Sequence, residues 1–178
     1  MKDIFTGILA LLISFGCLGQ PTVSSAERVV HENKEYKFKV SVPKDWIETS
    51  GFASSSDTLN TDLQWMLPKT YSVSENKEIA NSIYITAYNR VSITSIQKLI
   101  DVTFESFFNF HECRLEEDYA DKNARIILCT RNKYKFKGKY YFVIKKNISY
   151  VISFKATEDT YDKNLPVFES FYKSIKFL

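Results

Sequence analysis

Glycine is scarce in this chain of 178 residues, which has five glycines and four prolines. After residue 26 the only glycines are Gly51 and Gly138. Phosphate loops and dinucleotide fingerprints need several glycines at fixed spacing, because their backbone approaches a phosphate closely. The sequence therefore excludes both kinds of nucleotide site. It also contains no Gly-x-Ser-x-Gly nucleophile elbow, and its composition excludes a collagen-like chain.

Histidine and cysteine are also few, with two and three residues. A zinc site usually recruits several of them, so neither His31 nor His111 favours a metal centre. We interpret His111 as a helix C-terminal residue favoured by the helix dipole. Four acidic residues cluster without the glycine that a calcium loop needs for its sharp turn: Glu116, Glu117, Asp118 and Asp121. We therefore expect no cofactor, no metal site and no catalytic site.

A membrane-spanning run of about 18 apolar residues is missing as well. The longest apolar stretch, 4–15, follows Lys2, and Ser24 and Ala26 place small side chains where a signal peptidase needs them. We predict that residues 1–26 are a signal peptide and that the protein is exported, to a periplasm or to the outside. The net charge of +3 is mild and argues neither for nor against a nucleic-acid partner. Export argues against one.

Cys17 suggests a different fate for this segment. A small residue before a cysteine, here Gly16, is typical of bacterial lipoproteins, although Ser14 and Phe15 depart from the usual pattern. Lipidation of Cys17 would tether the domain to a membrane. Two more fates are compatible with the sequence, namely cleavage after Gly19 and retention of the segment as an uncleaved N-terminal anchor.

The remaining two cysteines, Cys113 and Cys129, lie at equal distances from residue 121, inside the turn-forming segment 120–123. In a pair of antiparallel strands, the residue numbers of facing residues add up to a constant. The two cysteines are therefore predicted to face each other across a hairpin. An oxidising compartment favours a disulfide between them. The alternatives are two buried thiols and a redox-active pair, although the latter would normally need Cys-x-x-Cys.

The hydrophobic pattern changes between period two and helical spacing along the chain. It predicts a helix from Ile96 to about Phe110, with Ser92, Thr94 and Ser95 as candidate N-caps. A second helix is predicted over 160–174, with Pro166 either near its start or at a kink. Turns are expected at Lys137–Gly138 and Lys146–Asn147. Strands are expected over 35–42, 63–67, 83–88, 112–119, 124–134, 139–145 and 148–154, with polar loops at 50–61 and 69–81.

This order of elements predicts an α+β fold, in which an antiparallel β-sheet meander carries two main α-helices packed on it. Residues 27–34 are expected to be an N-terminal extension, and residues 35–178 a single domain.

A basic hairpin is the most suggestive surface in the sequence. Cationic residues alternate there with aromatic residues and Gly138, so that a strand would send them to one face: Arg131, Lys133, Lys135, Lys137 and Lys139. Such a face suits an acidic partner or an anionic membrane surface. The alternative is an exposed strand face whose lysines prevent edge-to-edge pairing.

The two tryptophans invite separate interpretations. Trp46 follows Pro43 closely and is expected in the core. Trp65 lies between two polar segments, so it is either a core residue or an exposed anchor for a partner.

Two segments of this chain resemble the PsbP-like and DcrB-like superfamily. These domains begin with a segment similar to Tyr36–Val42 followed by Pro43-x-x-Trp46. They end with segments similar to Tyr150–Phe154, a Phe-rich helix and Ser174–Phe177. The resemblance spans residues 33–178 and implies an α/β/α sandwich. Members of this superfamily mostly bind other proteins or act as accessory subunits, and they share no catalytic residue set.

We therefore expect a non-catalytic exported binding or accessory module, whose partner is another protein of the envelope or secretory compartment. A lipid-tethered envelope structural protein is the first alternative. An exported hydrolase with a dispersed site is the second.

Overall fold

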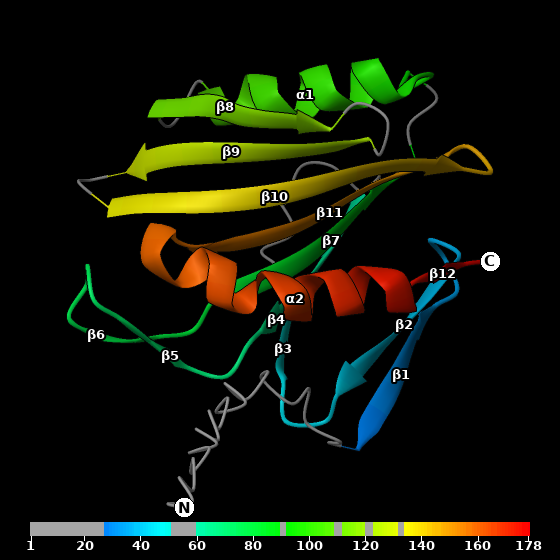
Figure 1. Cartoon of the computed structure of the whole chain (residues 1–178). Coiled ribbons are helices and arrows are strands. Elements are labelled where there is room, and N and C mark those ends of the chain that lie inside the picture. Colours follow the sequence, from blue (N-terminus) through cyan, green and yellow to red (C-terminus); the bar gives the residue numbers. More distant parts are fainter. Residues whose placement is uncertain (1–26, 51–59, 90–91, 109–111, 120–122, 132–133) are drawn as a thin grey trace, which may run out of the picture.

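The computed structural model describes residues 27–50, 60–89, 92–108, 112–119, 123–131 and 134–178 (Figure 1). Within them, one large sheet holds seven strands, each antiparallel to its neighbours. In spatial order these are β3 (Ile47–Ser50), β4 (Asn60–Met66), β7 (Ser82–Tyr88), β11 (Ile148–Thr157), β10 (Tyr134–Lys145), β9 (Ala124–Arg131) and β8 (Glu112–Tyr119).

Two smaller sheets flank this one. The first joins β1 (Arg28–Asn33), β2 (Phe38–Pro43) and β12 (Lys176–Phe177), and the second joins β5 (Thr70–Ser72) and β6 (Lys77–Ile79). Residues 27–34, which we expected to extend from the domain, instead contain β1, and all six residues of β1 pair along β2.

The two helices cover opposite faces of the large sheet. Helix α1 (Ile96–Phe108) packs against β10 and β8, whereas α2 (Glu158–Ser174) packs against β11, β10 and β2 (Figure 1). Helix α2 begins at Glu158 and runs through Pro166. The alternative in which this helix begins near Leu165 is therefore wrong. The expected α+β sandwich is confirmed.

Alternate side chains of β10 supply both cores. Tyr141 faces α2, where its ring stacks on Tyr172 at 3.8 Å. Tyr140 and Phe142 face α1, and both rings meet Phe104 edge-on at 5.9 and 5.7 Å. The aromatic run at the centre of this strand is therefore divided between two hydrophobic clusters, one on each face of the sheet.

Turn positions in the meander match the sequence only in part. The Lys146–Asn147 turn is confirmed, and positive φ values of 48° and 64° identify it as the tight hairpin type that matches strand twist. The turn expected at Lys137–Gly138 is wrong, because both residues pair within β10. A Cβ at Gly138 would lie 2.8 Å from Cε2 of Tyr140. This glycine therefore makes room for a buried ring rather than for a turn.

We predict that Gly138→Ala lowers the free energy of unfolding by about 1–3 kcal/mol, because the new methyl group overpacks against the ring of Tyr140. Urea unfolding measures this. In a Tyr140→Leu background the same substitution should cost less, since the ring is gone. An equal cost in both backgrounds would contradict the explanation.

Candidate functional site

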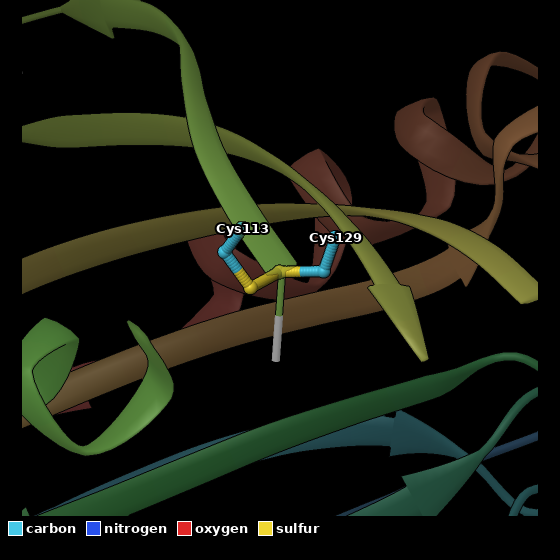
Figure 2. The surroundings of a disulfide bond; sticks show 2 residues. All are labelled: Cys113 and Cys129. Atoms are coloured by element: carbon cyan, nitrogen blue, oxygen red, sulfur yellow. A yellow bond between two sulfur atoms is a disulfide. The ribbon is translucent and has the colours of Figure 1, made fainter. Parts of the chain in front are cut away.

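A disulfide joins Cys113 of β8 to Cys129 of β9 (Figure 2). The two residues are direct partners in the antiparallel register, and their Cα atoms lie 4.1 Å apart. The predicted pairing is confirmed. Because β8 is an outer strand of the large sheet, the bond fixes this edge to the body of the domain.

A depression of about 350 Å³ lies next to the disulfide. Its described lining comes from three neighbouring strands: Cys113, Arg114, Leu128, Thr130 and Lys135. Leu128 is buried, whereas Arg114 and Lys135 are exposed. Among the residues that the structure describes, neither cation has an ion-pair partner. The depression therefore places two exposed positive charges near the buried side chain of Leu128.

The rest of the predicted basic face is arranged differently. Lys137 forms an ion pair of 2.9 Å with Glu116 and lies over the ring of Tyr161. Lys139 pairs with Glu169 of α2. Their side chains are only 17% and 14% exposed. The expectation that these two lysines form a free cationic surface is wrong, because they lie under or beside α2 and stabilise its packing.

The remaining two cations of the predicted face have no described side chain. Lys133 lies outside the described residues, and Arg131 ends β9. Of the five predicted hairpin cations, Lys135 is the one that the structure shows to be exposed. Arg114 joins it from β8, although the sequence pattern did not single it out.

Trp65 is a core residue, and its interpretation as an exposed anchor is wrong. Its side chain is 0% exposed and its ring lies 5.3 Å from that of Phe171 in α2. Strand β4 pairs with both β3 and β7, so its inward side chains are covered. Trp46 is half-buried and stacks on the same Phe171 at 6.0 Å.

The opposite face of the sheet carries a polar cluster that the sequence pattern did not reveal. Lys155 of β11 lies over the ring of Tyr84 of β7 at 4.8 Å. Burial lowers the pKa of Lys155 to about 8, and the nearby carboxylate of Asp62 opposes this shift. Burial and the same carboxylate raise the pKa of Tyr88 to about 12. These residues come from three strands, so only the strand order could have revealed them.

Asp159, in the first turn of α2, holds the β5–β6 hairpin. Its carboxylate accepts hydrogen bonds from the hydroxyl of Ser72 at 3.0 Å and from the backbone N–H of Val73 at 2.6 Å. Desolvation raises its pKa, but hydrogen bonds from Thr157, Ser74 and Ser72 outweigh this and leave the pKa well below the ordinary value. The lowered pKa of Asp159 therefore results from the hydrogen bonds by which this residue holds the β5–β6 hairpin against α2.

The described segments hold no group of three or more His, Cys, Asp or Glu residues that could bind a metal ion. Neither described helix is long and apolar enough to cross a membrane. His111 and Cys17 lie outside the described residues.

No protein-family model matches this chain, and no curated protein matches its sequence. Among solved structures, the chain is similar to the solution structure of cyanobacterial PsbP (CyanoP) from Synechocystis sp. PCC 6803, with 11% identity and a TM-score of 0.51. The similarity covers 92% of this chain and 100% of that chain. The PsbP-like fold expected from the sequence is confirmed, and at this identity the likeness concerns the fold alone.

We predict that replacing both cysteines, Cys113→Ser with Cys129→Ser, lowers the free energy of unfolding by about 3 kcal/mol, since the bond closes a loop between residues 16 apart. Denaturant unfolding with and without a reducing agent measures this. The reduced native protein should unfold like the double variant. A variant as stable as the oxidised native protein would contradict the prediction.

We also predict a rise in stability between pH 8 and 10 that depends on Lys155. In this window the unfolded chain keeps the lysine proton that the native state, with a pKa of about 8, has released. The free energy of unfolding therefore increases with pH. Tyr88 does not change the pH dependence of stability below about pH 10. It keeps its proton there in both the native and the unfolded state, because its pKa is about 10 unfolded and about 12 in the native state.

Urea unfolding of the native protein and of Lys155→Met at several pH values tests this. The variant should lack the rise, while Lys135→Met, at an exposed lysine of β10, should keep it. Parallel curves for the native protein and Lys155→Met would refute the assignment.

Proposed function

We propose that this protein is a non-catalytic, exported binding module that takes an acidic segment of another protein into the depression beside the disulfide. The observation that carries the proposal is a pair of exposed cations, Arg114 and Lys135, which have no ion-pair partner among the described residues and line the depression together with buried Leu128. None of the five described lining residues is acidic. Complementary charge steers such a partner and fixes its position.

The disulfide supports two parts of the proposal, namely the export of the protein and the ordered position of the binding site. Such bonds persist in oxidising compartments and are rare in a reducing cytosol. The N-terminal segment, with its signal-peptide pattern, agrees with this location. The bond also holds the β8 side of the depression against β9, so the two cations are presented from paired, ordered strands rather than from a loop.

The fold supports a binding role in a more general way. The superfamily that the sequence resembles consists mostly of proteins that bind others or serve as accessory subunits, and the chain shares the fold of cyanobacterial PsbP. The function itself is argued from the depression, because one fold hosts many functions.

The first test uses a fluorescein-labelled peptide of ten glutamates and fluorescence anisotropy. We expect the double variant Arg114→Glu with Lys135→Glu to bind it at least about tenfold more weakly than the native protein, because two attractive contacts become repulsive. The matched control is Lys69→Glu with Lys163→Glu, which changes the net charge equally at exposed positions elsewhere. Equal weakening in both variants would contradict a specific site.

A photocrosslinking amino acid at Thr130, which lines the depression, extends the test to the source cells. Mass spectrometry then identifies the protein segment that is captured. The proposal expects an acidic segment that is lost in the charge-reversed variant. Capture of a segment without acidic residues, or capture that persists in that variant, would overturn it.

A further inference from the structure

A second cavity, of about 230 Å³, lies on the other face of the sheet, between α1 and the strands β8 and β9. Ile100 and Phe104 line it from the helix, and Leu115 and Ile127 line it from the strands. Leu115 is 48% exposed, although it is a large apolar side chain. The cavity is therefore an apolar slot that opens to solvent near the sheet edge.

Arg125 places a positive charge in this slot. Its side chain is only 10% exposed and forms a 2.8 Å ion pair with Asp118, which is itself 46% exposed. The same nitrogen, Nη1, donates a 2.8 Å hydrogen bond to the backbone carbonyl of Ala124. Within the described residues, no hydrogen bond comes from Nε or Nη2. The guanidinium thus lines the cavity with donors that a second acceptor can use.

Size and charge together define the ligand. The volume holds about eight water-sized groups, which is too small for a nucleotide. The mainly apolar lining suits a short hydrocarbon chain rather than a sugar. A guanidinium fork binds a planar carboxylate with two parallel hydrogen bonds. Because Asp118 already offsets part of the charge of Arg125, a single negative charge is a better match than a phosphate dianion.

We propose that this cavity binds a medium-chain carboxylate, with the carboxylate on Arg125 and the hydrocarbon tail between α1 and the strands β8 and β9. Leu115 forms the mouth, where a longer tail would emerge into solvent. The site is separate from the basic depression, since its strand residues lie on the α1 face of the sheet, and it does not depend on the function proposed above.

The test uses ¹⁵N-labelled native protein, titrated with sodium octanoate and, separately, with 1-octanol, its uncharged counterpart. We expect shifts of the amide signals of Leu115, Arg125 and Ile127, and binding of octanoate at least about tenfold tighter than that of octanol. Equal affinities, or shifts confined to the opposite face of the sheet, would overturn the proposal. No variant is needed for this comparison.

Two variants then test the two ends of the ligand. Leu115→Trp should close the mouth and weaken octanoate binding at least about tenfold. Ile47→Trp, at an exposed aliphatic residue on the opposite edge strand, should leave it unchanged. Arg125→Gln should make octanoate and octanol bind alike, with thermal unfolding as the check on folding. Unchanged octanoate binding by Leu115→Trp, or a retained preference for octanoate in Arg125→Gln, would refute the assignment.

Discussion

The two-sided burial of β10 is the constraint on which the rest of the structure depends. Its neighbouring residues Tyr140 and Tyr141 must each enter a different core, and a shift of one residue in register would exchange them. Antiparallel partners on both sides, β9 and β11, fix that register. Once it is fixed, the places of α1 and α2, and of the surfaces beside them, follow.

Both proposed sites lie at the β8 side of the large sheet, one on each face. Beside α2 the sheet face carries Arg114 and Lys135 at the rim of an open depression. Beside α1 the outer strands leave a slot that contains Arg125. The difference in chemistry follows from burial. Exposed, solvated cations suit an extended acidic partner, whereas a nine-tenths buried guanidinium suits a small ligand that replaces its lost hydration.

The sequence predicted the elements better than it predicted the surfaces. The disulfide pairing, the Lys146–Asn147 turn and the two-helix sandwich depend on local spacing, which is visible in one dimension. The sequence could not decide whether Trp65 is buried, and the free cationic face expected for Lys137 is wrong. In both cases exposure depends on β3, β7 and α2, which are remote in sequence. The Lys155 cluster and the Arg125 slot were invisible for the same reason, since each is assembled from several separate elements.

The pairing of β12 with β2 has a consequence for the order of folding. Lys176 and Phe177 lie opposite Lys39 and Phe38, so the small sheet joins segments more than 130 residues apart. The ring of Phe177 also packs against Tyr150 at 4.7 Å. During synthesis, this corner stays incomplete until residues 176–177 have emerged. The domain therefore closes its outer layer late, after the local hairpins of the meander have had time to form.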